Sequence, residues 1–480
     1  MNIQNAILRR ISLLTGWLVC CASPRNLTVR VPAAARTLLA VRLCALLLGS
    51  VMLGPTLLAQ TAQTAPLQLT LKDSIALALK QNIDVQVANI NLATSQQDRK
   101  IARSALLPQA SLKATEEVQR FNVQAFIGES ITGLPKNIGP FQSVNVGPRF
   151  STPIFDLSLL RKYQASGHQL EASKEDEKST REETVLLTTA QYLALLRAEA
   201  SVKAAESRVQ LAESLSKQAH DLLSSGVATN IDVSRAEVRV LTERQALIDA
   251  QSEIESNTFA LRRILNVPDS QQLEFLDADT FSETPLLDIP DPVSTALSKR
   301  PELLALLQRQ EAAKDDRKSA AAESLPKLAF AGGWNEQGRT LQSMDPGYDY
   351  QVSFNVPIFT GGRLSAERKN AALAEKKVEQ QLLDARNRVE EQVRDGLVEL
   401  QASRSDVDLG QQRLQLANQE VELARGRFSE GVTDNIEVTT AQDELAHAND
   451  VEIGALYRYN IARANLARAA GVIEQVYLQQ

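Results

Sequence analysis

An eleven-residue segment that occurs twice constrains the fold of this 480-residue chain more than any other feature. Leu223–Val233 reads LSSGVATNIDV, and Phe428–Val438 reads FSEGVTDNIEV. Each copy lies between two long stretches rich in Ala, Leu, Glu, Gln and Arg, residues that favour helix. Similarity at a fixed spacing indicates two structural repeats that share one core.

The similarity extends to other parts of the two halves. The tripeptide DRK begins at Asp98 and at Asp316, each time a few residues before Leu-Pro, and the tripeptide PIF begins at Pro153 and at Pro357. The first copy is longer between Leu-Pro and PIF, where a loop absorbs extra residues at small entropic cost. Four segments result: a leader at 1–62, a first repeat at 63–267, a linker at 268–291 and a second repeat at 292–480.

The leader has the layout of a secretory signal peptide. Residues 1–62 contain six Arg and no Lys, Asp or Glu, and the apolar run Leu43–Leu58 precedes the small residues Ala59 and Ala62. We expect cleavage near these alanines. An alternative is lipidation at Cys20, which the preceding valine disfavours.

Export changes the composition of the chain. The leader holds all of the cysteines, namely Cys20, Cys21 and Cys44. The exported chain therefore has neither disulfides nor thiol chemistry. Loss of the six arginines shifts the formal net charge from -6 to -12, which argues against nucleic acid and anionic lipid surfaces as partners.

A very long helix is predicted from Leu364 to Phe428. This stretch lacks Pro, and a helix of about 65 residues is about 100 Å long. One heptad ladder, called the first ladder, comprises Val393, Leu400, Val407, Leu414, Val421 and Phe428. A second ladder, on nearly the opposite side, comprises Ala402, Leu409, Leu416 and Leu423. Two opposed ladders predict a helix packed on both sides, as in a cylinder of helices.

The other helical stretches complete a set of four columns. Asp156–Ser224 predicts the matching long helix of the first repeat. The returning helices, Ile231–Leu265 and Ile436–Ala470, are about half as long, as are the opening helices, Leu71–Leu106 and Val293–Ser324. Two short helices stacked end to end span one long helix. Each chain therefore supplies four helical columns of similar length.

The inserts before each long helix predict β-hairpins. From Tyr348 to Ile358 apolar residues alternate with polar ones, and similar alternation surrounds Val144 and Phe330. Of the 20 aromatic residues after the leader, 11 fall within these inserts, and apolar strands with an aromatic bias are typical of membrane β-barrels. Four strands cannot close a barrel, and open edges are not tolerated in lipid. The chain must therefore oligomerise.

These features together resemble the outer-membrane efflux protein family, the TolC-like channel-tunnels. The resemblance runs from about Leu69 to Val472, and its most specific parts are Pro357–Arg363 (PIFTGGR), the PIF at Pro153 and the two Gly-Val turns. It implies a mainly α fold with β strands, in which a homotrimer forms an outer-membrane β-barrel that continues into a periplasmic α-helical barrel.

The resemblance also assigns roles to the duplicated turns. In the family, such turns form the periplasmic tip, where an adaptor docks and where the tunnel is closed at rest. The matching docking positions are Gly226, Val227, Gly431 and Val432. The family's gate acids match Asp232 and Glu437, whereas a second gate acid and a basic latch correspond to Thr440 and Thr433. The gate of this chain therefore departs from the family's pattern.

Each of these residues also has a purely structural interpretation. A glycine between two helices commonly ends the first one, and acids in a first helical turn favour the helix dipole. Pro153 and Pro357 lie at the predicted strand-to-helix junctions, where Pro ends a strand because it lacks the amide hydrogen. We expect Gly361 and Gly362 to redirect the chain from strand to helix.

The function that fits best is a passive exit duct in the outer membrane. The resemblance implies a periplasmic adaptor and an inner-membrane pump of the RND, ABC or MFS type as partners, with outer-membrane lipid around the barrel. The alternative is a periplasmic coiled-coil adaptor without a pore, which the alternating strands disfavour. We expect no enzyme, cofactor or metal site, because the three histidines have no ligand-type spacing and no catalytic motif is present. No motif in the sequence identifies the cargo.

Overall fold

The computed structural model describes residues 67–122, 137–276, 289–340, 342–430, 432–433 and 435–478, together with 125, 128, 133 and 135. The predicted leader, the turn residue Gly431 and part of the predicted linker, from 277 to 288, lie outside the described residues. All elements below belong to one compact unit, Ala65–Gln480.

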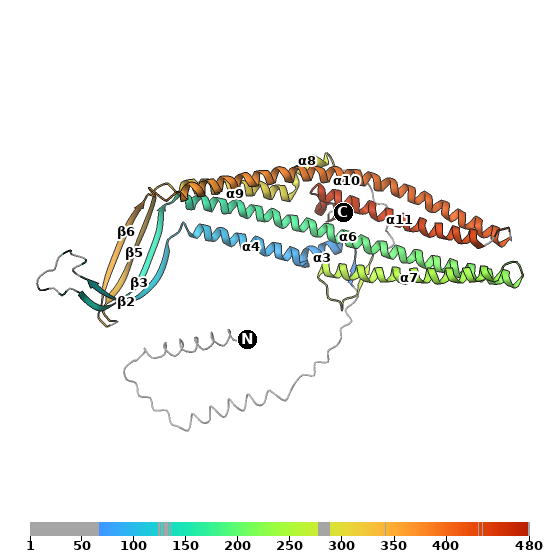
Figure 1. Ribbon diagram of the computed structural model, residues 1–480, viewed down its shortest axis with the longest axis horizontal. Helices are drawn as coiled ribbons and strands as arrows, with labels where there is room; N and C mark the ends of the chain where they lie inside the picture. The colour runs from blue at the N-terminus through green and yellow to red at the C-terminus, as the bar shows by residue number, and fades with distance from the viewer. Residues whose placement is uncertain are drawn as a thin grey trace, which may run out of the picture. The chain divides into compact units, whose positions relative to one another are not determined.

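The long helices are confirmed. Helix α6 (Leu157–Ser224) has 68 residues and α10 (Arg363–Ser429) has 67. The returning helices are α7 (Asn230–Leu265) and α11 (Asn435–Ala469). Figure 1 shows the two helical hairpins side by side, with both turns at the end of this unit away from the strands.

The opening helices differ from the prediction, because each is broken. The first copy has α3 (Leu71–Gln81) and α4 (Ile83–Ser104), and the second has α8 (Pro292–Lys299) and α9 (Pro301–Ala322). The predicted continuous helices are therefore wrong in both repeats.

Local chemistry explains both breaks. The side chain of Asn82 caps α4 by accepting from the Asp84 amide at 2.8 Å, and its own amide donates to the Ile264 carbonyl at 2.9 Å. In the second repeat, Pro301 at the start of α9 keeps Arg300 extended, with φ -60° and ψ 121°, because a residue before proline disfavours helix.

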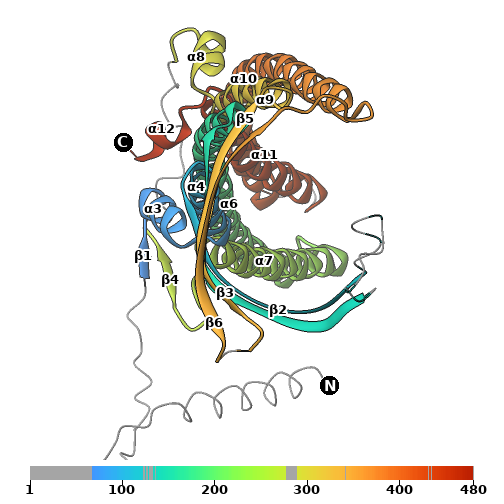
Figure 2. The same ribbon diagram turned by 90° about the vertical axis from the view of Figure 1, so that its left-hand side faces the viewer.

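The helices that pack against α6 and α10 differ between the strand end and the turn end of the helical layer. Near the strands, α6 lies between α4 and α9, and α9 contacts α10; near the turns, α6 lies between α7 and α11, and α11 contacts α10. Figure 2 views this arrangement from the sheet end. One outer edge of the helical layer is therefore formed by α10. The other is formed by α4 near the strands and by α7 near the turns.

The first ladder is buried within the chain. Val393 and Val407 of α10 are fully buried, and Leu400 is 6 % exposed; they pack on Leu456 and Tyr459 of α11. The second ladder is different, because Leu409, Leu416 and Leu423 are 63 %, 65 % and 70 % exposed. The described chain thus covers one predicted side of α10 and leaves the other open.

The strands form a four-stranded antiparallel sheet in the order β2 (Gln109–Asn122), β3 (Asn137–Phe155), β5 (Lys327–Gly338) and β6 (Met344–Asn355). The two predicted hairpins are therefore confirmed, although β6 ends three residues before the predicted limit at Ile358. A small parallel pair, β1 (Leu67–Leu69) with β4 (Leu273–Phe275), lies beside the middle of α6, where Tyr192 donates to the Leu69 carbonyl.

The sheet has one apolar and one polar face, as the alternation predicts. On the polar face, Arg149 and Asp349 lie 3.8 Å apart. On the apolar face, Phe150 contacts Phe330 and Tyr350, with ring centroids 5.6 Å and 6.1 Å away. The exposed side chains of the apolar face include Leu112, Val118, Trp334, Tyr348, Tyr350, Val352 and Phe354.

Candidate functional site: the hairpin turns and the strand-to-helix junction

The first turn ends α6 through a left-handed glycine. Gly226 has φ +75°, and its amide donates to the Leu223 carbonyl at 3.0 Å, while the Val227 amide donates to Leu222 at 2.9 Å. This is the usual glycine termination of a helix. No atom lies within 4 Å of a Cβ built at Gly226, so the backbone angle alone requires glycine. Val227 is 59 % exposed at the tip.

The second turn repeats this arrangement in the part that is described. The Val432 amide donates to the Arg427 carbonyl at 3.0 Å, and the Val432 side chain is 64 % exposed. Two valines are therefore presented at equivalent turns, on the same end of the two hairpins (Figure 1).

The two predicted gate acids have different partners. Asp232 accepts hydrogen bonds from the amide and the hydroxyl of Thr229 at 2.9 Å and 2.6 Å, an arrangement that caps α7. These bonds hold the pKa of Asp232 below its ordinary value. The capping pattern Thr-x-x-Asp was readable in the sequence.

Glu437, in contrast, forms an ion pair across its hairpin. Its carboxylate lies 2.9 Å from the Arg427 guanidinium of α10 and accepts a hydrogen bond from the Thr433 hydroxyl. The basic partner of this acid thus comes from the end of α10 and not from position 433. Sequence reasoning missed Arg427, although it lies one turn before the duplicated glycine.

Charged side chains also link the two hairpins. Arg239 of α7 contacts Glu243 at 2.6 Å and forms an ion pair with Asp443 of α11. Arg208 of α6 joins Glu243 at 3.2 Å and Asp450 of α11 at 3.3 Å. The spacing of Arg239 and Glu243 on one helix face was visible in the sequence, but the contacts with α11 were not.

A groove lies between α7 and α11 beside these links. It has a volume of about 620 Å³, and Ile231, Val238 and Ile436 line it together with Thr440. Thr440, the position that the resemblance aligns with a second gate acid, lines this groove near the turns.

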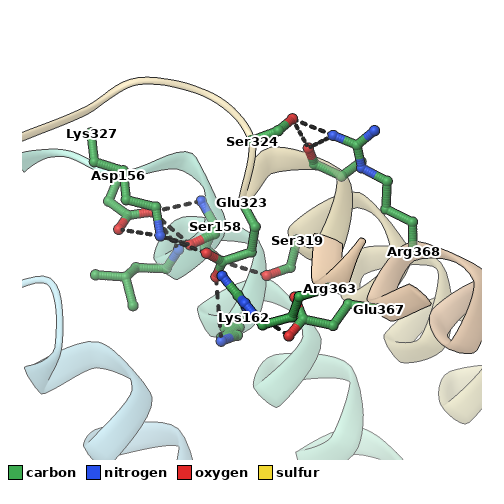
Figure 3. Close-up of polar contacts among 12 residues, drawn as sticks. Asp156, Ser158, Lys162, Ser319, Glu323, Ser324, Lys327, Arg363, Glu367 and Arg368 are labelled. Atoms are coloured by element: carbon green, nitrogen blue, oxygen red, sulfur yellow. Dashed lines mark hydrogen bonds and ion pairs between the residues drawn. The ribbon is translucent and has the colours of Figure 1, made fainter. Parts of the chain in front are cut away.

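At the opposite end, the first strand-to-helix junction is held by charged side chains (Figure 3). Asp156 caps α6 by accepting from the Ser158 and Leu159 amides at 2.9 Å and 3.2 Å. Burial raises the pKa of Asp156, but these hydrogen bonds and the Lys327 charge outweigh it and keep the pKa below its ordinary value. The ammonium of Lys327 lies 3.5 Å from Asp156 and 2.7 Å from Glu323 at the end of α9.

This cluster joins the two repeats at the sheet. Lys327 is the first residue of β5, so it ties the start of that strand to the start of α6 and the end of α9. Beside it, the buried Ser319 hydroxyl of α9 donates to the Ser158 carbonyl at 2.9 Å. These contacts tie the junction to the start of α6, the end of α9 and the start of β5.

The predicted junction residues occupy different positions in the two repeats. Pro153 lies within β3 next to a register shift, and the strand continues to Phe155. The interpretation that Pro153 ends the strand is thus wrong; its missing amide hydrogen is instead accommodated by an irregularity in the pairing. Pro357 follows the end of β6, as predicted.

Gly361 and Gly362 make the predicted change of direction before α10. Their φ angles are +60° and +86°, and no atom lies within 4 Å of a Cβ at either position. Glycine is therefore needed for the left-handed backbone. After the turn, Arg368 of α10 donates to the Ala321 carbonyl and to the Ser324 hydroxyl (Figure 3). This contact caps the end of α9.

The described ranges lack two further kinds of feature. Within these residues, no group of three or more His, Cys, Asp or Glu side chains could hold a metal ion. In the same part of the chain, no helix is both long enough and apolar enough to cross a membrane.

Comparisons with known proteins place this geometry in a family. The model of the family described as "Outer membrane efflux protein" matches residues 74–267 and 293–472. The alkaline protease secretion protein AprF of Pseudomonas aeruginosa is 23 % identical over 425 residues, covering 86 % of each chain. The outer membrane protein TolC of Vibrio cholerae is 22 % identical, covering 78 % of this chain and 84 % of TolC.

Solved structures show the same fold. The outer membrane channel CmeC of Campylobacter jejuni superposes with a TM-score of 0.73 at 20 % identity, covering 84 % of this chain and 86 % of CmeC. CusC superposes with the same TM-score at 17 % identity, covering 84 % and 92 %. Because the family model matches both repeats, the chain belongs to the outer membrane efflux protein family.

Proposed function

We propose that this chain is one subunit of a homotrimeric exit channel that spans the outer membrane and reaches into the periplasm. The observation that carries the proposal is the pair of uncovered edges on a single chain. Both the sheet and the helical layer end in surfaces that a soluble monomer would not expose.

The sheet supports the membrane part of the proposal. Its apolar face exposes large side chains, with Tyr348 and Phe354 at 73 % and 70 % exposure, opposite a polar face that would line a water-filled interior. Strands β2 and β6 are the outer strands of the sheet, so their backbone groups on one side lack a strand partner within the described chain. Lipid does not tolerate such edges, and pairing between chains removes them.

The helical layer supports oligomerisation independently. The second ladder on α10 is one exposed edge. The other edge is apolar as well, with Ile90 and Ile101 of α4 at 64 % and 65 % exposure and Val238 of α7 at 62 %. Burying such surfaces contributes about 25 cal/mol per Å² of apolar area. A ring of chains would cover both edges at once.

The exposed turns support a proposal about partners. We propose that the exposed valines at 227 and 432 are part of an adaptor-docking tip that includes Gly226 and Gly431, and that Asp232 and Glu437 are gate acids. An inner-membrane pump of the RND, ABC or MFS type would supply cargo. Relatives are named for different cargoes, alkaline protease for AprF and pyoverdine for OpmQ of Pseudomonas aeruginosa.

Membrane fractionation and bilayer conductance test the channel. A subunit of a channel should fractionate with the outer membrane and conduct ions in planar bilayers, whereas a periplasmic adaptor should stay soluble without detergent. Glu437→Gln should raise the open probability about threefold or more, because it weakens an exposed ion pair worth roughly 0.2–1 kcal/mol in each of three chains. Glu422→Gln on α10, 77 % exposed, is the matched control. No conductance from the parent or from Asp232→Asn/Glu437→Gln would reject the proposal.

A further inference from the structure

The polar face of the sheet carries an ion pair between two strands that are not neighbours. Arg149 belongs to β3 and Asp349 to β6, and β5 lies between these strands. Gly333 of β5 lies opposite both residues, and Ser111 of β2 lies opposite Arg149, so the four residues form one row across the sheet. Neighbouring strands are about 4.8 Å apart, which separates the backbones of Arg149 and Asp349 by roughly 10 Å. Their charged groups nevertheless approach to 3.8 Å, so the Arg149 side chain extends along the sheet.

Gly333 provides the space for this crossing. A Cβ built at Gly333 would lie 3.1 Å from Cγ of Arg149 and 2.8 Å from the carbonyl oxygen of Pro148. The Arg149 side chain therefore occupies the space above the Gly333 backbone that a larger residue would fill. Gly333 does not have a left-handed backbone, so glycine is required here for space and not for its φ angle.

The preceding glycine has the same effect on the apolar face. A Cβ at Gly332 would lie 2.6 Å from the Tyr350 ring and 3.0 Å from the Phe150 ring. These two rings, from β6 and β3, have centroids 6.1 Å apart. The consecutive glycines therefore let side chains of β3 and β6 meet across β5 on both faces, as aromatic rings on one face and as an ion pair on the other.

We propose that Arg149 and Asp349 determine the ion selectivity of the β-barrel part of the channel. This inference rests on the proposed channel, in which the polar face lines the pore. Both side chains are open to water, with 46 % and 53 % exposure. Ser111 and Gly333 carry no charge, so the two charges cancel within the row. Charged side chains arranged around a pore select ions by sign, and symmetry would repeat this row in each chain at one level.

The pairing gives each partner a defined effect. With both present, the row passes cations and anions without preference. Loss of Asp349 would leave an unpaired arginine in each chain, free to project into the pore and favourable to anions. Loss of Arg149 would leave an unpaired aspartate, favourable to cations. The two losses should therefore act in opposite directions, and their combination should cancel.

Reversal potentials in planar bilayers test this inference. The permeability ratio of potassium to chloride is measured in a gradient of dilute KCl, since the Debye length is about 30 Å at 0.01 M. Asp232→Asn/Glu437→Gln is used as the background, so that the proposed gate acids do not contribute. In this background, Asp349→Asn should lower the ratio and Arg149→Gln should raise it, each by roughly twofold or more. The combined variant should return to the ratio of the background.

Two matched controls use the same sheet. Glu336 of β5 follows Asn335 and lies on the opposite face by strand alternation, so Glu336→Gln should leave the ratio unchanged. Lys113 of β2 lies opposite Gly147, on the same face as Arg149 and in the next row. Lys113→Gln should raise the ratio and calibrates the effect of one charge in each chain. All shifts should shrink in about 1 M KCl, where the Debye length is about 3 Å, whereas a structural defect would not follow the salt concentration.

The outcomes separate this inference from the proposed channel. A conducting background whose ratio is unchanged by both single variants would overturn the inference and leave the channel standing. Shifts of the two variants in the same direction would also overturn it. Absence of conductance from both the parent and the background would overturn the channel, and the inference with it.

Discussion

Arg468→Met should destabilise the protein through a buried charge cluster at the middle of the helical columns. The Arg468 side chain, near the end of α11, is 9 % exposed and lies 3.1 Å from the carboxylate of Glu182 on α6. It also forms an ion pair with Glu302 of α9. Glu302 keeps a second partner in Arg300, at 3.2 Å, so the carboxylate of Glu182 is the charge left without a partner. Removing one partner of a buried ion pair costs about 3–5 kcal/mol.

The expected loss of stability can be measured as a lower midpoint of thermal unfolding. The unfolding entropy is about 2.1 cal/mol/K per residue, so in a chain of this length each kcal/mol of lost stability lowers the unfolding midpoint by roughly 1 °C. The midpoint should therefore fall by about 3–5 °C. Circular dichroism of the detergent-solubilised protein at pH 8 measures this. Arg458→Met is the matched control, because Arg458 on the same helix lies 3.1 Å from Asp406 in a pair that is 56 % and 42 % exposed. Such a surface pair contributes under about 1 kcal/mol. Equal midpoint shifts in the two variants would refute the reasoning.

Three further perturbations test single positions. Burial raises the pKa of Glu182 from 4.5 to about 7, so the folded chain holds a proton that the unfolded chain releases, and stability falls as pH rises through this window. Glu182→Gln should remove this slope in thermal melts and stabilise by on the order of 1–3 kcal/mol at pH 8, but not at pH 4. Gly226→Ala should destabilise by about 1 kcal/mol through its left-handed backbone, whereas Gly426→Ala, within α10, should stabilise by about the same amount. Gly332→Ala would place a Cβ 2.6 Å from a tyrosine ring and should lower the heat stability of the oligomer on gels, whereas Gly347→Ala, with 3.5 Å available, should not.

Long periodic patterns made most of the fold predictable from sequence. The limits of α10 differ by one residue at each end from the predicted Leu364–Phe428, because heptads continue without proline over the whole stretch. The strand faces followed from alternation around Val144 and Phe330. The breaks in the opening helices were missed, although Pro301 was a readable signal at the second one. At Asn82 the deciding contact, with the Ile264 carbonyl, is tertiary and leaves no local pattern.

The candidate site was less predictable than the fold. Periodicity shows which helix face is buried, but it does not show which charged side chains on neighbouring helices meet. The pairing of Arg239 with Asp443 depends on how two hairpins are placed side by side, and so does the cluster around Arg468. The partners of Asp232 and Glu437 are local by comparison, and these two acids differ because their turns diverged in sequence.

The duplication bears on the proposed assembly of the chain into a ring. In an array of repeats, each unit covers one face of its neighbour, and terminal units need a polar outer face to remain soluble. Both edges of this array expose apolar side chains: Leu409, Leu416 and Leu423 at one edge, and Ile90 and Ile101 at the other. A linear array of two such repeats would leave these edges and the open sheet ends exposed. In the proposed ring, every edge would be covered by the kind of contact that already joins the two repeats, and the internal contact would be the template for assembly.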